Sequence, residues 1–451
     1  MEIKQGYKQT DIGVIPSDWE VKEFQDVMDG FSSGQTPYRG NKEFYKGDIP
    51  WITSGELNYN TITDTIEKIT KEGVKAANLK VIPKGTFLFA ITGLEAAGTR
   101  GSCAITGIEA TTNQSCMALY PKKGKLITEY LFHYYIRYGN ELAFEYCQGT
   151  KQQSYTGGIA KKLPIILPST LAEQTAIATA LSDADSYIAS IEKLIEKKRL
   201  IKQGAMQQLL SESGFARLKD KQDFLDDINL KNLVNQKNPD SDKWVVKKLG
   251  EIFVFHSTAN FSKAEMSFDG KIGCLHYGLI HAIPNVKFSL ENGVRFYLKE
   301  DTTKYELIKD GDILMVDASE DYLGINKSIE VSNVSNRKYI AGLHTYLMRD
   351  ENAILVNGFR GLILNSTIVK QQFHKLAVGM KVYGVSKSQL KDVLICYPNK
   401  EAQTRIAAIL SDMDNEIATL EKKLSKAQSI KQGMMQQLLT GKIRLNQDLQ
   451  D

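Results

Sequence analysis

The chain has 451 residues, more than one hydrophobic core usually accommodates, so we expect two or more domains. Hydrophobic residues make up 42% and charged residues 24% of the chain, as in soluble globular proteins, and no run of about 18 apolar residues predicts a transmembrane helix. The net charge of +4 is small, so bulk charge alone does not indicate a nucleic-acid partner.

The compartment is predicted from the N-terminus and the cysteines. Met1 to Thr10 is polar and lacks the apolar core of a secretory signal. The five cysteines are scattered and odd in number, which fits a reducing environment, so we expect a cytoplasmic protein.

The first predicted domain spans residues 1–168 and mixes strands with helices. Gly85–Ile91 and Cys116–Tyr120 are short apolar runs bounded by turn-forming residues, which is typical of strands. Tyr130–Phe144 has a helical pattern, and Pro168 marks the entry to the next segment.

Residues 169–212 are predicted to form a long helix without proline. Its apolar side chains recur in steps of three and four, at Leu181, Ala184, Ile188, Ile191 and Ile195. Such a heptad seam is typical of helices that pack knobs into holes, and an ordinary core helix is the alternative. Gly204 favours a kink or a change of packing partner near the end of this helix.

A polar connector is predicted over residues 213–243, followed by a second mixed domain over residues 244–398. In this domain Asp312–Val316 is strand-like and Phe359–Leu376 has a helical pattern. A second proline-free helix is predicted over residues 399–445, and the same seam recurs there at Leu410, Met413, Ile417, Leu420 and Leu424.

The two helical segments are copies of one sequence. Residues 174–210 recur as residues 403–439, with 22 of the 37 aligned positions identical. Weaker echoes upstream pair Trp19–Phe24 with Trp244–Leu249, Pro83–Phe89 with Lys309–Met315, and Gly149–Lys151 with Gly379–Lys381. The repeating unit is therefore a globular segment followed by a helical one.

Two matched seams in one chain can pack against each other. Because each helix leads away from its own globular segment, an antiparallel pair would carry these segments at opposite ends, about an approximate two-fold axis. We therefore predict an α+β fold in which two mixed α/β domains are separated by two long helices that form an antiparallel coiled coil.

Known catalytic motifs are incomplete in this sequence. No Pro-Pro pair is present, as an adenine methyltransferase pocket would need, and Gly93–Arg100 lacks the lysine of a phosphate-binding loop. His276 and His281 lack the further ligands of a metal site. Pro239–Lys243 lacks the separated acid and lysine of a nuclease, so we expect no catalytic activity and no bound metal or cofactor.

Together, the motifs resemble the specificity (S) subunit of type I restriction-modification systems. Tyr7–Lys22 resembles the entry into the first target recognition domain of that family, and Gly47–Leu57 resembles a recurring segment of the domain. Leu167–Ala178 and Lys202–Leu210 resemble the central spacer helix, and the second copy resembles the distal one. One departure is that Ala402 replaces the glutamate of the family's Glu-Gln pair, so little weight rests on Glu173.

The resemblance implies that each domain reads one half of a bipartite, asymmetric double-stranded DNA target. The helices would set the gap between the halves and dock methyltransferase (modification) subunits, two in number. S-adenosylmethionine, ATP and Mg would be bound by these and by translocase/nuclease (restriction) subunits, and not by this chain.

Base edges are read by polar side chains on loops and strand ends. In the first domain we expect DNA contacts from Arg39, Thr53, Ser54, Thr99, Arg100, Lys151, Gln152 and Ser154. In the second domain we expect them from His276, Tyr277, Asn326, Lys327, Lys381, Tyr383 and Lys387. Both copies place Gly-x-Lys before the helical segment, where a loop amide and the lysine would hold a phosphate.

Two alternatives remain open at this point. A scaffold protein would use the coiled coil to join two ligand-binding domains, and its binding would lack the salt sensitivity of phosphate contacts. A fragment of a fused single-chain restriction enzyme is the other alternative, and the lack of a catalytic motif argues against it.

Overall fold

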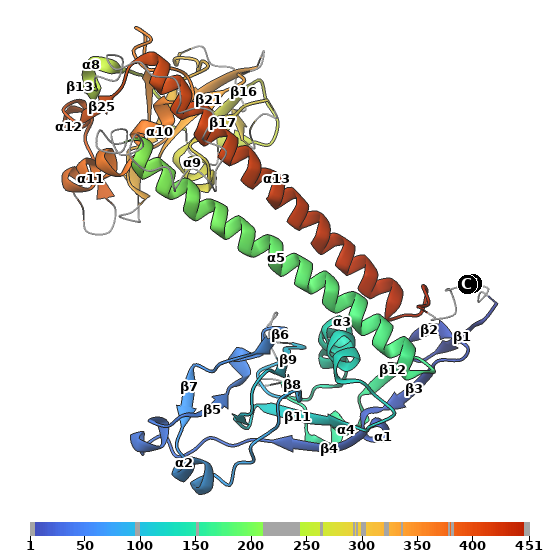
Figure 1. The fold of residues 1–451 in the computed structure, drawn as a ribbon. Helices are drawn as coiled ribbons and strands as arrows, with labels where there is room; N and C mark the ends of the chain where they lie inside the picture. The colour runs from blue at the N-terminus through green and yellow to red at the C-terminus, as the bar shows by residue number, and fades with distance from the viewer. Residues whose placement is uncertain are drawn as a thin grey trace. The chain divides into compact units, whose positions relative to one another are not determined.

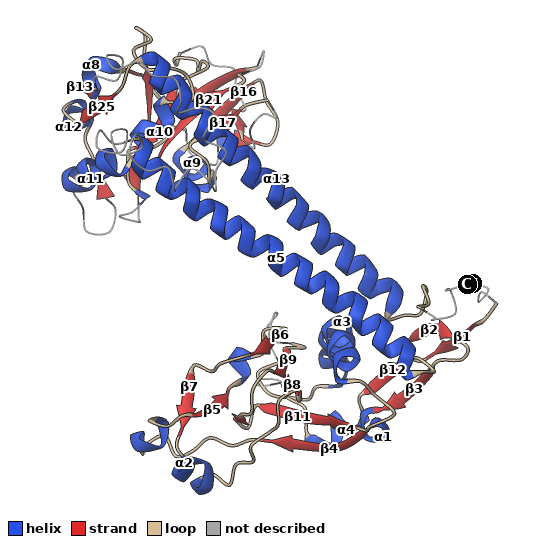
Figure 2. Ribbon diagram, in the orientation of Figure 1, coloured by secondary structure: helices blue, strands red, loops and turns tan. Residues whose placement is uncertain are grey.

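The computed structural model forms two compact units, Met1–Glu192 with Lys422–Asp451, and Lys193–Glu421. Strands and helices are mixed in each unit (Figure 2), and no described helix is long and apolar enough to cross a bilayer. The predicted connector, residues 213–243, lies outside the described residues. The structure describes residues 5–94, 100–149, 153–210, 244–261, 265–291, 294, 296–298, 304–319, 324–334, 337–377, 379 and 383–445.

The elements of the first unit include four predicted from the sequence, namely two apolar strands (β8 and β11) and two helices (α3 and α5). In chain order they are β1 (Tyr7–Thr10), β2 (Gly13–Pro16), β3 (Glu20–Glu23), α1 (Phe24–Val27), β4 (Met28–Ser33), η1 (Lys42–Tyr45), β5 (Ile49–Ile52), η2 (Ser54–Glu56), β6 (Asn60–Ile62), β7 (Glu67–Ile69), α2 (Lys71–Ala76), β8 (Phe87–Ala90), β9 (Cys103–Thr106), β10 (Thr111–Thr112), β11 (Cys116–Pro121), α3 (Thr128–Tyr146), α4 (Gly157–Lys162), β12 (Pro164–Leu167) and the long helix α5 (Leu171–Leu209).

The second unit begins with the last part of α5 and contains most of α13. Its elements are β13 (Val245–Lys248), α8 (Leu249–Ile252), β14 (Val254–His256), β15 (Met266–Ser267), β16 (Ile272–Leu275), α9 (Tyr277–Ala282), β17 (Lys287–Ser289), β18 (Tyr297–Leu298), β19 (Ile313–Val316), β20 (Ala318–Ser319), β21 (Ser328–Ser332), β22 (Lys338–Ala341), β23 (Thr345–Arg349), α10 (Arg360–Leu364), α11 (Thr367–Leu376), β24 (Tyr383–Gly384), α12 (Lys387–Lys391), β25 (Leu394–Tyr397) and the long helix α13 (Lys400–Leu438).

Each unit is built on the same five-stranded sheet. The strand order is β4-β11-β8-β9-β6 in the first unit and β14-β23-β19-β21-β17 in the second. The last pair is parallel in both sheets, β6 with β9 and β17 with β21. The two globular segments therefore share one topology, although only faint sequence echoes connect them.

The middle strand of each sheet is buried on both faces. All four side chains of β8 and all four of β19 are buried, which explains their continuous apolar sequences. In the first unit α3 covers the sheet, and Tyr135 of α3 packs edge-on against Phe87 and Phe89 of β8. In the second unit the predicted helix over 359–376 is split into α10 and α11, because the side chain of Asn365 bonds to two carbonyls and ends the first helix.

Portions of α5 and α13 pack against each other in each unit (Figure 1). In the second unit Lys202 pairs with Asp414, and Lys198 Nζ lies 2.8 Å from Glu416 Oε1. Residue numbers rise along one helix as they fall along the other, so the helices run antiparallel. In the first unit Lys431 pairs with Asp185. These are the repeat equivalents of Lys202 and Asp414, so the same ion pair forms once in each unit.

The predicted seam faces the partner helix or the core at most of its positions. Leu181, Ile191, Ile195, Leu410 and Ile417 are buried. Ile188, Met413, Leu420 and Leu424 are half-buried.

The two leucines of each Gln-Gln-Leu-Leu motif pack into the hydrophobic core of a unit. Leu209 and Leu210, at the end of α5, are buried in the core of the second unit. Leu438 and Leu439, at the end of α13, are buried in the core of the first. Both helices continue through their glycines without a break.

The repeated glutamine near the start of each helix makes the same bond in both units. Gln174 Oε1 accepts a hydrogen bond from the Ile127 amide at 3.1 Å, and Gln403 Oε1 accepts one from the Val356 amide at 2.9 Å. Both glutamines are buried. A buried amide needs such partners, which accounts for the glutamine in both copies.

The two ends of the described chain meet at a cluster that we call the terminal clasp, made of Asp18, Trp19, Glu173 and Arg444. Glu173 is 3% exposed and accepts hydrogen bonds from Trp19 Nε1 at 3.1 Å and Arg444 Nε at 2.6 Å. Arg444 also donates to both oxygens of Asp18 at 2.8 Å. In the first copy the Glu173 carboxylate therefore has a definite structural role. The second copy has Ala402 at the equivalent position and lacks this carboxylate.

The clasp predicts an acid-sensitive contribution to stability. Hydrogen bonding from Arg444 lowers the pKa of Asp18 from 3.8 to about 2. A lowered folded pKa stabilises the folded chain above pH 3.8, and this contribution is lost as the pH falls toward 2. Replacing Arg444 with Met would leave Glu173 buried without its cation, so we expect a loss of about 3 kcal/mol at neutral pH.

Melting curves from pH 7 to pH 2 test this prediction. Arg444→Met should melt well below wild type at pH 7 and lose less further stability than wild type between pH 4 and 2. The matched control is Arg137→Met, which removes an exposed pair with Glu141 and should change little. Equal effects of the two substitutions would contradict the assigned role of the clasp.

Candidate functional site

Four chain segments meet at strand ends in each unit, and we call this region the strand-end junction. In the first unit it comprises residues 52–54, 91–94, 113–115 and 153–155. In the second unit it comprises residues 275–277, 317–319, 342–344 and 383–385.

Parallel strand pairing creates the first contact of the junction. β5 pairs in parallel with β10, and β16 pairs in parallel with β22. The carboxyl ends of parallel strands lie at the same edge, so the segments that leave them start side by side. Asn113 N donates to Ile52 O at 2.9 Å, and Gly342 N donates to Leu275 O at 2.8 Å.

Two further backbone hydrogen bonds add the remaining segments in the first unit. Ile91 N donates to Ser115 O and Tyr155 N donates to Ile91 O, both at 2.9 Å. The predicted DNA contact Ser154 lies beside the second bond, in a bridge with Thr92.

The second unit repeats both bonds. Asp317 N donates to His344 O at 3.3 Å, and Val385 N donates to Asp317 O at 3.4 Å. Tyr383, another predicted contact, pairs with Ser319 where β20 meets β24. The junction is therefore a duplicated backbone framework, and its side chains differ between the copies.

In the first unit an arginine lies over an exposed ring next to the junction. Arg100 donates from Nε to Leu94 O at 2.7 Å and from a terminal nitrogen to Gln153 Oε1 at 3.4 Å. Its guanidinium lies 5.7 Å from the centre of the Phe144 ring, which is 75% exposed. Nearby, Thr53 donates its hydroxyl to Glu56 at 2.8 Å, so the carboxylate fixes the turn that presents Ser54.

In the second unit the junction presents a tyrosine among histidines. Tyr277 is 41% exposed, and its ring centre lies 5.9 Å from that of His276, 6.4 Å from His281 and 5.5 Å from His344. His344 Nδ1 lies 3.2 Å from Asp317 Oδ1, which orients the imidazole. Aromatic faces and imidazole nitrogens together can contact bases by stacking and by hydrogen bonding.

The predicted DNA contacts included His276 and Tyr277 of this cluster but not His281, His344 and Asp317. His344 follows β22 as Ser115 follows β10, so a residue-level alignment of the two diverged domains would have indicated it. His344 also has a left-handed backbone, with φ of 56°, which marks it as a special turn position.

Asn326 and Arg39 have structural partners. Asn326 is 1% exposed, and its amide donates to Val316 O at 3.3 Å. The prediction that Asn326 contacts DNA is therefore wrong, because no surface of its side chain is available. Arg39 makes a bidentate pair with Glu67, at 2.6 and 2.8 Å, and a hydrogen bond from Arg39 lowers the pKa of that glutamate.

Two predicted lysines are also engaged. Lys327 donates from Nζ to the carbonyl oxygens of His281 and Ile283. Lys387 lies 5.1 Å over the ring of Phe255, at the start of α12. Thr99, Lys151, Gln152 and Lys381 lie outside the described residues, and with them the two Gly-x-Lys lysines.

The described part of the chain contains no candidate metal-binding site. No group of three or more His, Cys, Asp or Glu side chains there is placed to hold an ion. His276 and His281 both flank Tyr277 but have no third ligand in that part.

Comparison with known proteins gives a consistent result. A family model described as the type I restriction modification DNA specificity domain matches residues 16–200 and 241–429. Over 272 residues the chain is 34% identical to the type I restriction enzyme MjaIX specificity subunit of Methanocaldococcus jannaschii, and the match covers 58% of each chain. The chain thus spans little more than half the length of this relative. It is 24% identical to the MjaVIII specificity subunit of the same organism, over 96% of this chain and 94% of the relative.

Solved structures have the same fold. A type I restriction-modification S subunit from M. genitalium superposes with a TM-score of 0.55 at 16% identity, over 97% of this chain and 98% of the other. A chain from a structural study of complex assembly and conformational transition of the type I R-M system gives a TM-score of 0.57 at 14% identity, over 95% and 99%.

Proposed function

Because this chain belongs to the type I restriction-modification specificity-subunit family, we propose that it is a non-catalytic, sequence-specific DNA-recognition subunit. Each globular domain reads one half of a bipartite, asymmetric target. S-adenosylmethionine, ATP and Mg are bound by partner subunits, and the complex works in the cytoplasm.

The duplicated strand-end junction is the observation that carries this proposal. The backbone hydrogen bonds recur, while Ser54, Ile91 and Ser115 are replaced by Tyr277, Asp317 and His344. A reader of two different half-sites needs this combination, because a common framework can present different donors and acceptors to base edges. A scaffold whose two domains bind the same ligand would have no need for different side chains at the two junctions.

The helices supply the spacing. Each has 39 residues, which corresponds to a length of about 60 Å at 1.5 Å per residue. One turn of DNA is about 34 Å. Helices of this length are therefore long enough for the two domains that they join to reach half-sites at least one turn apart. The helix length then fixes the gap in the target.

The same helices offer surfaces to two methyltransferase subunits, one for each copy. Tyr187, Leu194, Leu200 and Ile430 are large apolar side chains on α5 and α13 that remain exposed. Glu416, Lys423 and Ser429 occupy the positions of Tyr187, Leu194 and Leu200 in the second copy, so the apolar side chains do not recur. The feature that is exposed in both copies is the glutamine beside each glycine, Gln203 and Gln432. Restriction subunits would join through the methyltransferase subunits.

Exchange of one domain tests the division of labour. Residues 244–398 would be replaced by the corresponding domain of another family member, and the methylated sequence mapped after expression with the methyltransferase subunit. We expect one half-site to change while the other half-site and the gap stay the same. A change in both halves would contradict independent reading.

Single substitutions test the junction itself. Tyr277→Ala should weaken binding to the specific duplex by about 1–3 kcal/mol, with no equal loss on unrelated DNA, because base contacts carry specificity. Phe268→Ala is the control, since Phe268 is an aromatic residue of the same unit that is 74% exposed and lies outside the junction. Binding of the full complex would be measured at several salt concentrations. Unchanged specificity in Tyr277→Ala, or salt-independent binding of DNA, would contradict the proposal.

A further inference from the structure

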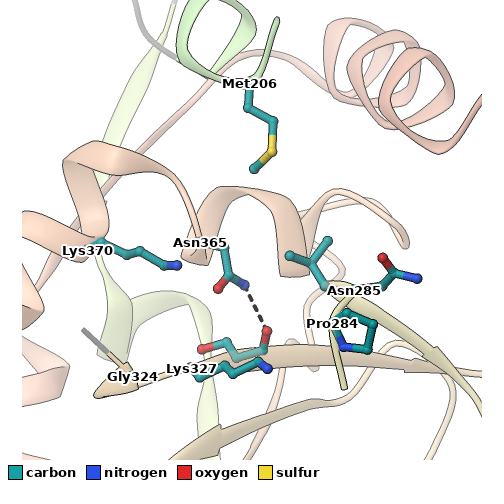
Figure 3. A pocket seen from close by; sticks show the side chains of 9 residues that line it. Met206, Pro284, Asn285, Gly324, Lys327, Asn365 and Lys370 are labelled. Atoms are coloured by element: carbon teal, nitrogen blue, oxygen red, sulfur yellow. Dashed lines mark hydrogen bonds between the residues drawn. The ribbon is translucent and has the colours of Figure 1, made fainter. Parts of the chain in front are cut away.

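A hollow of about 180 Å³ lies in the second unit beside the loop that precedes β21 (Figure 3). Lys327 lines it from this loop and Lys370 from α11, while Asn365 lies between the two short helices. Met206 of α5 covers another side. None of the described residues that line the hollow is acidic.

The two lysines make the hollow cationic. Lys370 is half-buried, and its ammonium makes no hydrogen bond or ion pair with any residue in the described part of the chain. Burial lowers the pKa of Lys370, and burial together with the charge of Lys370 lowers the pKa of Lys327. The two carbonyl oxygens that Lys327 contacts accept two hydrogen bonds from its ammonium but leave its charge uncompensated.

The positive charges of Lys370 and Lys327 repel each other across a partly desolvated hollow with no acidic residue among its described lining, which is unfavourable. An anion with several oxygens would offset both the desolvation cost of the lysines and the repulsion between them. It can accept a hydrogen bond from Lys370, and its negative charge screens the two positive charges. The Asn365 amide donates to Ser328 O and Gly361 O, both at 2.8 Å, so it fixes the wall of the hollow.

We propose that this hollow binds a phosphate-type oxyanion between Lys370 and Lys327. Gly324, on the rim, lies against Ser319 of the strand-end junction and against His281, so the hollow adjoins the surface assigned to DNA. The anion is therefore either a phosphodiester of the DNA backbone or free phosphate. Only the first source rests on the proposed function.

The test compares the wild-type full chain with Lys370→Gln and with Lys375→Gln. Lys375 lies on the same helix, is exposed and does not line the hollow, so it controls for the loss of one positive charge. Titration calorimetry with inorganic phosphate, at constant ionic strength, reports on the free anion. The salt dependence of binding to the target duplex reports on the phosphodiester.

Saturable phosphate binding that is at least about tenfold weaker in Lys370→Gln alone would support the proposal. If the salt slope of DNA binding also falls by about one unit in Lys370→Gln alone, the ligand is a DNA phosphate. An unchanged slope with lost phosphate binding identifies free phosphate as the ligand. The proposal is overturned if Lys370→Gln changes neither quantity, or if Lys375→Gln changes them equally. Failure to bind DNA specifically would leave the phosphate titration interpretable.

Discussion

Each unit of this protein depends on a helix end supplied by the other repeat. Leu209 and Leu210 complete the core around α10 and α11, and Leu438 and Leu439 complete the core around α3. Each buried leucine contributes roughly 2 kcal/mol, so a domain without its two leucines would lose a large part of its margin of stability. The requirement acts in both directions, which explains why Gln-Gln-Leu-Leu is unchanged in the two copies.

This shared requirement divides the chain into parts that can and cannot vary. Residues of the helices meet the same neighbours twice, as the Lys431–Asp185 and Lys202–Asp414 pairs illustrate. The segments of the strand-end junction are joined by the same backbone hydrogen bonds in both units, although the side chains differ. Under the proposed function, one framework can therefore present different side chains to the two half-sites.

Periodicity and repetition predicted the parts of the fold that depend on local pattern. The seam residues, the strands β8, β11 and β19 and the helix α3 follow from apolar spacing. The order of the five-stranded sheet does not, because strand neighbours are set by tertiary pairing. Asn326 was predicted to contact DNA because polar side chains on loops read base edges, yet its left-handed backbone and buried amide serve the turn.

Three further features could not be predicted, because each depends on contacts between distant parts of the sequence. Glu173 was given little weight because the second copy has Ala402 at the equivalent position. Its structural role depends on Trp19 and Arg444, which are far away in the sequence and could not be identified as its partners. His344 lies in a segment without a motif, and it joins Tyr277 only through parallel strand pairing. The sequence likewise does not reveal that Lys370 is half-buried, and it is this burial that lowers the pKa of its ammonium.

The central claim is that one helical unit, present twice, pairs with itself in an antiparallel register. Charge reversal at the repeated ion pairs tests it most directly, with melting temperature as the readout. Asp185→Lys and Lys431→Asp should each lower stability by about 1–2 kcal/mol, and together they should restore it; the same should hold for Asp414 and Lys202. The mismatched combination, Asp185→Lys with Lys202→Asp, should not be restored. Recovery in the mismatched variant, or no recovery in the matched ones, would contradict the account.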